Sequence, residues 1–307
     1  MAANLPRRLL AVCEANGAQG SSVIHAALGS GFAVRALMRN IDSGKARALR
    51  DQGVQVVRAH FREDDASSLA AAFAGAHAAF MVENFWENGH VAKEPMQACR
   101  LADAAKAAGV ERCIFSTLND PSSSQAVGCS HFRAIGMPTT FIVSSLYYEF
   151  FMGVGSAAPT ATVAPQKVPG AHPPRLRLGL PMGRARLPAV ALADIGRLAV
   201  ALLLDPSSAG RTVGLAGDML TGEQFAATFT RVLGVPTDYA PPSFDEFRDE
   251  PSTMAAELGN QFEAWHDMEA VNCALHEQTQ ARRYLPDLLA FEQWLQLNKH
   301  NYAYLLC

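Results

Sequence analysis

The residue types best suited to chemistry lie in a short turn near the N-terminus. Apolar residues 9–12 are followed by Glu14-Ala15-Asn16-Gly17-Ala18-Gln19-Gly20 and then by apolar residues at helical spacing. A strand, a tight glycine turn and a helix in this order are typical of the βαβ unit that binds a dinucleotide. Gly17 lets the backbone approach a phosphate, Gly20 lets the helix lie close to the strand, and the helix N-terminus offers free N–H groups to the anion. The predicted cofactor-binding residues of this turn are Asn16, Gly17, Ala18, Gln19 and Gly20.

Glu14 stands where the usual G-x-x-G-x-x-G spacing places its first glycine. Its side chain adds a Cβ where the turn is tightest and a charge of the same sign as a pyrophosphate. Like charges about 4 Å apart repel by roughly 4 kcal/mol at an effective dielectric of about 20, or about three orders of magnitude in affinity. If the side chain swings into solvent, screening reduces this penalty. We therefore expect weak cofactor binding or none.

Arg39 is the second charged residue that bears on this site. It lies near the end of a predicted strand within residues 31–40, nineteen residues after Gly20. In NAD-binding versions of the unit, an acidic residue near this place binds the ribose hydroxyls. A guanidinium instead pairs with a 2′-phosphate and stacks on adenine, so NADP fits better than NAD. The alternative is a solvated arginine at a strand edge.

The elements that must position these residues alternate along the chain. Further strands are predicted at 54–57, 76–82, 110–116 and 137–143, with helices at 42–52, 67–73 and 91–109 between them. This alternation predicts an α/β fold with a Rossmann-type, doubly wound parallel sheet. Ligands bind at the carboxyl ends of such strands. That edge adds two predicted cofactor-binding residues, Asn84 in a polar and aromatic loop and Ser116 at a strand end.

Length and composition limit the class of protein. The 307 residues allow a Rossmann domain, placed at 1–144, and a smaller C-terminal α/β lobe at 145–307, interleaved with the end of the sheet. A net charge of −3 gives no case for nucleic acid or an anionic membrane, and no apolar run reaches the length of a bilayer. Six cysteines without a C-x-x-C or Cys/His cluster indicate reduced thiols, no metal site and a cytoplasmic location.

The sequence holds no pattern for conventional catalysis, and we predict no catalytic residue. A tyrosine can move a proton when a lysine close by lowers its pKa, but no tyrosine of the chain has a lysine four residues later. Tyr147 and Tyr148 are instead followed at that distance by Phe151 and Met152. No G-x-S-x-G nucleophile elbow is present either.

Several segments together resemble the NmrA-like family, regulatory relatives of the atypical short-chain dehydrogenases/reductases, and most resemble its animal redox-sensor branch. The resemblance implies a Rossmann domain with a smaller lobe, NADP(H) binding without established turnover, and regulation of a partner protein by the NADPH/NADP ratio. It rests on the order of residues 16–23, 34–40, 53–57, 84–87, 135–140, 193–196, 214–217, 220–224 and 291–295.

The sequence departs from this family in three places, and each weakens a dinucleotide site. Glu14 replaces the first glycine, and Ala59-His60 stands where the family commonly has Gly-Asp near the adenine. The stretch between Thr117 and His131 looks shortened, and no lysine between positions 106 and 167 can supply the family's contact to the nicotinamide side.

These observations favour a non-enzymatic NADP(H)-responsive regulator that binds a protein partner through its C-terminal lobe. The expected location is the cytoplasm, with the nucleus and a homodimer left open. One alternative is an atypical NADPH-dependent reductase of a small carbonyl or quinone compound, with Tyr147 or Tyr148 as proton donor. Another is an interaction scaffold that binds no nucleotide.

Overall fold

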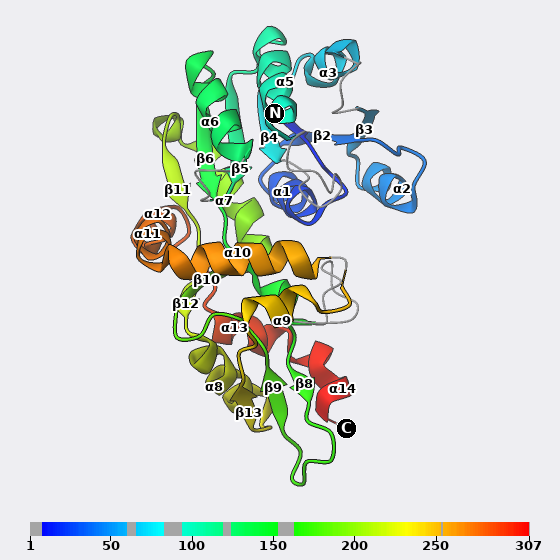
Figure 1. Ribbon diagram of the computed structural model, residues 1–307. Coiled ribbons are helices and arrows are strands. Elements are labelled where there is room, and N and C mark those ends of the chain that lie inside the picture. The colour runs from blue at the N-terminus through cyan, green and yellow to red at the C-terminus, as the bar shows by residue number, and fades with distance from the viewer. Residues whose placement is uncertain are drawn as a thin grey trace. The chain divides into compact units, whose positions relative to one another are not determined.

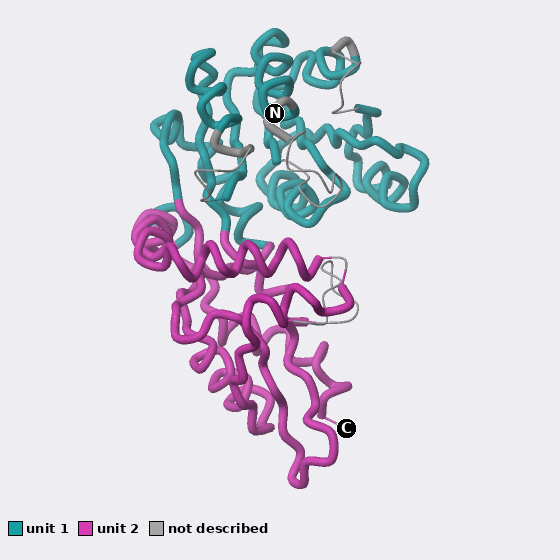
Figure 2. The backbone as a smooth tube through the Cα atoms, viewed as in Figure 1, with its two compact units in different colours: residues 1–144, 193–213, 283–285 teal, residues 145–192, 214–282, 286–307 magenta. Residues whose placement is uncertain are grey.

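The structure, a computed structural model, describes residues 8–59, 66–82, 94–118, 124–152, 163–252 and 254–306. The chain forms two compact units (Figure 2). Unit 1 comprises residues 1–144, 193–213 and 283–285, and unit 2 comprises residues 145–192, 214–282 and 286–307. No helix in the described residues is long and apolar enough to cross a membrane.

Unit 1 is built on a seven-stranded sheet of order β11-β6-β5-β4-β1-β2-β3. The five strand pairs between β6 and β3 are all parallel. The chain runs outward from β1 to β3 in one direction and from β4 to β6 in the other, so the strand order reverses between β1 and β4. This confirms the predicted Rossmann-type fold. The strands are β1 (Leu9–Val12), β2 (Ala33–Met38), β3 (Gln55–Arg58), β4 (Ala78–Val82), β5 (Arg112–Thr117), β6 (Thr139–Val143) and β11 (Thr212–Gly214).

Helices cover this sheet, which is why its strands are nearly continuous apolar runs. Every residue of β6 is buried, and so are four of the five residues of β4. Helices α3, α5 and α6 lie side by side (Figure 1), and their buried side chains join those of the strands in one apolar cluster. The unit 1 helices are α1 (Ala18–Gly29), α2 (Gly44–Asp51), α3 (Ala66–Phe73), α5 (Glu94–Ala107), α6 (Ser124–Ala134) and α7 (Leu192–Leu204, whose first residue belongs to unit 2), with a 3₁₀ turn, η3 (Pro206–Ser208).

Helix α6 begins within the stretch between Thr117 and His131 that looks shortened in the sequence, and no helix was predicted there. The helix contains Gly128, Cys129 and Ser130, which have low helix propensity. Its position is fixed by packing, because Phe132 is fully buried and its ring lies 5.0 Å from that of Phe115. The segment therefore does carry a helix, but it carries no lysine.

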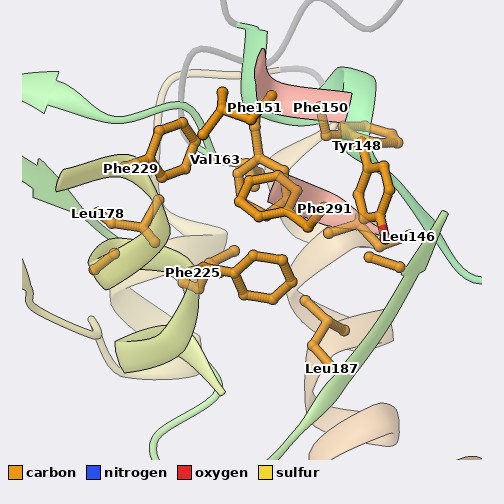
Figure 3. Close-up of a cluster of buried hydrophobic side chains, with 14 of the residues drawn as sticks. Leu146, Tyr148, Phe150, Phe151, Val163, Leu178, Leu187, Phe225, Phe229 and Phe291 are labelled. Atoms are coloured by element: carbon orange, nitrogen blue, oxygen red, sulfur yellow. The ribbon is translucent and has the colours of Figure 1, made fainter. Parts of the chain in front are cut away.

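Unit 2 contains two three-stranded sheets, β12-β10-β7 and β13-β9-β8, and a separate aromatic core. Phe291 lies at the centre of that core (Figure 3), with its ring 4.8 Å from that of Phe225 and 5.1 Å from that of Tyr148. The strands are β7 (Leu146–Tyr147), β8 (Gln166–Lys167), β9 (Leu176–Leu178), β10 (Leu187–Val190), β12 (Asp218–Leu220) and β13 (Thr237–Tyr239). The helices are α8 (Gly222–Leu233), α9 (Phe244–Arg248), α10 (Ala255–Asp267), α11 (Glu269–Leu275), α12 (Gln278–Tyr284), α13 (Phe291–Leu297) and α14 (Ala303–Leu306), with the 3₁₀ turns η2 (Tyr148–Met152) and η4 (Lys299–Tyr302).

Candidate functional site

The predicted glycine turn joins β1 to α1 at the reversal point of the sheet. The N–H of Gly17 donates to the carbonyl oxygen of Glu14 at 2.9 Å, and the N–H of Ala15 donates to that of Leu37 in β2 at 3.4 Å. Gly17 is the N-cap of α1, and no cap side chain accepts a hydrogen bond from the first turn of this helix. The first N–H groups of α1 therefore receive no hydrogen bond from a cap side chain.

Gly20 has the close-packing role that its place in the sequence predicts. A Cβ atom at this position would lie 2.3 Å from the carbonyl oxygen of Glu14 and 2.9 Å from the Cα of Ala15. Both atoms belong to the backbone and have no room to move aside. Only glycine therefore lets α1 pack this closely against the turn.

Glu14 departs from the usual glycine in both conformation and charge. Its φ of 48° is left-handed, and within the described part of the chain it is the only non-glycine residue with a positive φ. Only 6% of its surface is exposed, so the side chain does not swing out into solvent. The sequence left open whether the Glu14 carboxylate lies in the turn or swings into solvent. The structure shows the buried case, in which solvent screens its charge only weakly.

The carboxylate of Glu14 also acts on its neighbour. Burial raises the pKa of the Cys13 thiol well above its ordinary value, and the nearby Glu14 carboxylate and then Cys113 raise it further. Cys13 is fully buried and behaves as a small apolar residue of the core rather than as a reactive thiol.

Two cationic residues lie on the β2 side of the turn. Arg39 follows the last residue of β2 directly and is half-buried. Lys45, in the first turn of α2, donates from its Nζ to the carbonyl oxygen of Asn16 at 3.0 Å. Lys45 was not among the predicted site residues. The one sequence feature that could have pointed to Lys45 is its position, two residues after the helix N-cap Ser43 and six residues after Arg39.

Ser116 lies at the same edge of the sheet, two strands away from β1. It pairs with Val82 of β4 and Ile142 of β6 and is only 2% exposed. Its Oγ has no hydrogen-bond partner among the described residues. Buried polar atoms are normally hydrogen-bonded, so the hydroxyl of Ser116 departs from this rule. Asn84 and His60 lie outside the described residues.

The two tyrosines considered as proton donors belong to unit 2. Tyr148 is fully buried in the aromatic core. The ring of Tyr147, a partly buried residue, stacks on that of Phe150 at 5.7 Å. Both rings therefore have packing roles, and burial removes Tyr148 from the surface where a substrate binds. The described residues contain no group of three or more His, Cys, Asp or Glu that could hold a metal ion.

Fungal proteins are among the relatives of this sequence. Asnovolin J 5′,6′-dehydrogenase nvfM of Aspergillus novofumigatus is 26% identical over 245 residues, 73% of this chain and 69% of the relative. The nitrogen metabolite repression protein nmr of Neurospora crassa is 26% identical over 281 residues, 76% of this chain and 54% of the relative. The NmrA-like family domain-containing oxidoreductase notA′ of Aspergillus versicolor is 32% identical over 126 residues, 39% of this chain and 35% of the relative. The chain thus spans between 35% and 69% of the length of these relatives.

Solved structures share the fold over nearly the whole chain. The negative transcriptional regulator NmrA, crystallised with NAD, superposes with a TM-score of 0.78 at 20% identity, covering 97% of this chain and 98% of its own. A second NmrA structure, in complex with NADP, gives 0.77 with the same identity and coverage. Triphenylmethane reductase of Citrobacter sp., complexed with NADP(H), gives 0.74 at 20% identity over 94% of this chain and 99% of its own.

The sequence model of the NmrA-like family matches residues 6–295, which include the whole glycine turn and both cationic residues beside it. The chain belongs to the NmrA-like family.

Proposed function

We propose that this protein is an NADP(H)-responsive regulatory protein that binds the dinucleotide at the β1–α1 turn and performs no conventional hydride transfer. The observation that carries the proposal is the arrangement of Arg39 and Lys45 beside the N-terminus of α1, whose N-cap Gly17 has no side chain to cap it. A helix N-terminus suits the pyrophosphate, and a guanidinium suits the 2′-phosphate that distinguishes NADP from NAD.

The residues present fit the cofactor in most respects. Gly17 and Gly20 give the close backbone approach, and the orphaned hydroxyl of Ser116 supplies a polar group at the same sheet edge. Glu14 fits poorly, because its buried carboxylate lies in the turn that receives the pyrophosphate, and α6 supplies no lysine. We therefore propose binding that is weak enough to follow cellular nucleotide levels rather than a permanently held cofactor.

A regulatory role is favoured over a reductase role by the state of the tyrosines. Tyr148 is fully buried, and the ring of Tyr147 stacks on that of Phe150. Neither tyrosine is therefore placed as a proton donor. The names of the relatives include oxidoreductases as well as a repression protein, and NmrA is described as a transcriptional regulator. The regulated partner is proposed to be a protein bound by unit 2.

The role of Arg39 is tested by calorimetric titration of the wild type and Arg39→Glu with NADPH, NADP and NADH. Losing a charged hydrogen-bonded pair costs about 1.5–3 kcal/mol, so Arg39→Glu should bind NADPH about ten- to a hundredfold more weakly. NADH affinity should change much less, because NADH lacks the 2′-phosphate. Arg50→Glu is the matched control, since Arg50 is exposed in the last turn of α2 and carries the same charge change.

Unchanged NADPH affinity in Arg39→Glu would remove Arg39 from the site. Steady consumption of NADPH with a panel of aldehydes and quinones would favour the reductase instead. If neither the wild type nor Glu14→Gly binds any of the three nucleotides, the scaffold without nucleotide becomes the better proposal, and the buried carboxylate of Glu14 is the observation that favours it.

A further inference from the structure

We propose that binding of a dinucleotide at the β1–α1 turn takes up a proton onto Glu14, so that nucleotide affinity falls as pH rises. This inference rests on the proposed function and concerns the regulation of the same site. It gives the protein a second input, the proton concentration, beside the nucleotide itself.

The position of Glu14 is what couples the two events. Its carbonyl oxygen accepts the N–H of Gly17, the N-cap of α1, so the backbone of Glu14 is tied to the start of that helix. With a φ of 48° and 6% exposure, Glu14 lies inside the turn with its side chain buried. A pyrophosphate bound at α1 therefore meets this carboxyl group at short range.

The groups around Glu14 leave it as the one whose charge responds. On β1 and β5, the thiols of Cys13 and Cys113 are fully buried, and burial raises the pKa of each, so both stay neutral. On the β2 and α2 side, Arg39 and Lys45 contribute positive charge, and the ammonium of Lys45 is directed to the carbonyl oxygen of Asn16. The first turn of α1 contains no acidic residue. Asp42, on the same side, is exposed and pairs with Arg58 at 3.4 Å, so among the described residues of this turn Glu14 is the buried acidic group that opposes a second anion.

The sign of the effect follows from linkage. A nearby anion favours the neutral form of a carboxyl group, so the pKa of Glu14 is higher in the complex than in the free protein. Below the pKa of Glu14 in the free protein, Glu14 is protonated in both the free protein and the complex, and nucleotide affinity is at its maximum. Between the two values, binding takes up a proton and affinity falls by about tenfold per pH unit. Above the higher value, Glu14 is ionised in both states and affinity is low and constant.

The test is calorimetric titration of the full chain with NADPH and with NADH. Each titration is made in two buffers of different ionisation enthalpy, which gives the number of protons exchanged, and is repeated at about pH 6, 7 and 8. NADH is included because the 2′-phosphate of NADPH itself titrates near pH 6. Glu14→Gln is the matched variant, since it keeps the size and the Cβ of the side chain and removes its charge. Glu14→Gly removes both.

The wild type should take up as much as about one proton more per nucleotide than Glu14→Gln, for both ligands. Glu14→Gln should bind NADH with an affinity that is flat in pH and higher than that of the wild type at about pH 8. Equal proton uptake in the two proteins overturns the inference and leaves the proposed function intact. Binding by Glu14→Gly alone, with no wild-type binding at any pH, also overturns it, because the backbone or bulk of Glu14 would then be the obstacle. A failure of all three proteins to bind either nucleotide instead overturns the proposed function itself.

Discussion

At the scale of single residues, Glu14 combines a left-handed backbone with a buried acidic side chain. A φ of 48° brings the Cβ of an L-residue too close to its own carbonyl oxygen, at a cost of about 1–2 kcal/mol. The surrounding contacts must hold this strain, and they do so through the hydrogen bond from Gly17 and the close packing of Gly20 on the turn. The turn is therefore held in shape by its neighbours against the preference of the residue itself.

This strain predicts an unusual order of stability. Glu14→Gly should be more stable to unfolding than Glu14→Ala by about 1 kcal/mol, because glycine adopts this φ freely and the gain exceeds its extra entropy in the unfolded chain. Both variants lack the carboxylate, so the comparison isolates the backbone. The measurement is the urea midpoint at unchanged slope.

The same pair of substitutions at Asn16 is the control, since this exposed residue has no positive φ. The Asn16→Ala variant should be at least as stable to unfolding as the Asn16→Gly variant. If Glu14→Ala is also more stable to unfolding than Glu14→Gly, the backbone of the turn is not strained at position 14.

Only some features of the candidate site could be predicted from the sequence. The glycine spacing pointed to the turn, and the strand end pointed to Arg39. Whether Glu14 is screened depended on its burial, which a sequence does not contain. Lys45 approaches Asn16 only because α2 folds back beside the turn, so its contact spans 29 residues and has no local signal.

At the scale of elements, the contact between α1 and α7 explains why Gly196 follows the first turn of α7. The N–H of Gly196 donates to the Oγ of Ser22 at 3.1 Å, and that Oγ donates to the carbonyl oxygen of Ala193 at 3.4 Å. A Cβ atom at Gly196 would lie 2.3 Å from the backbone oxygen of Ser22. Helix α7 therefore approaches the helix that carries the candidate binding turn at backbone distance.

Gly196→Ala should destabilise the protein by about 1–3 kcal/mol, because the added methyl forces two backbones apart. The matched control is Gly29→Ala, at the end of α1, where a Cβ atom would meet nothing within 4 Å. Alanine there should stabilise the helix by about 0.5–1 kcal/mol. Thermal unfolding of both variants checks the opposite signs, and an unchanged melting temperature in Gly196→Ala would mean that α1 and α7 separate easily.

Most elements of unit 1 were predictable because the strands of a parallel sheet covered on both faces are long apolar runs in the sequence. Helix α6 was missed because its sequence has weak local preference and its stability comes from the burial of Phe132. The two-residue strands of unit 2, such as β8, are too short to show a period of their own. The start of α8 is marked locally, because Thr221 and Gln224, three residues apart, form a capping box there.

At the scale of the whole molecule, the two units share one chain that crosses between them repeatedly. Unit 1 is completed by residues 193–213, which lie beyond a long excursion through unit 2. These residues include nearly all of α7 and most of β11 (Figure 2). Arg112 of β5 donates to the carbonyl oxygens of Leu203 at 2.9 Å and Asp205 at 2.7 Å, and so binds the C-terminal end of α7. A cation at this end of a helix is stabilising.

A fragment that ends at residue 144 should therefore fail to fold, although it contains the whole glycine turn and six of the seven strands of the sheet. It loses the side chains of Ile195, Leu198, Leu202 and Leu203, which are all less than 5% exposed. Burying four such side chains contributes about 6–12 kcal/mol, as much as the entire stability of a typical domain, about 5–15 kcal/mol.

The fragment should bind an apolar dye, lack near-ultraviolet circular dichroism and unfold without a cooperative transition, while the full chain measured beside it does the opposite. A cooperative transition in the fragment would show that six strands and their own helices suffice for a stable sheet. Residues 193–213 would then be an addition to unit 1 rather than part of its core, and nucleotide titration of that fragment would locate the binding turn in the shorter segment.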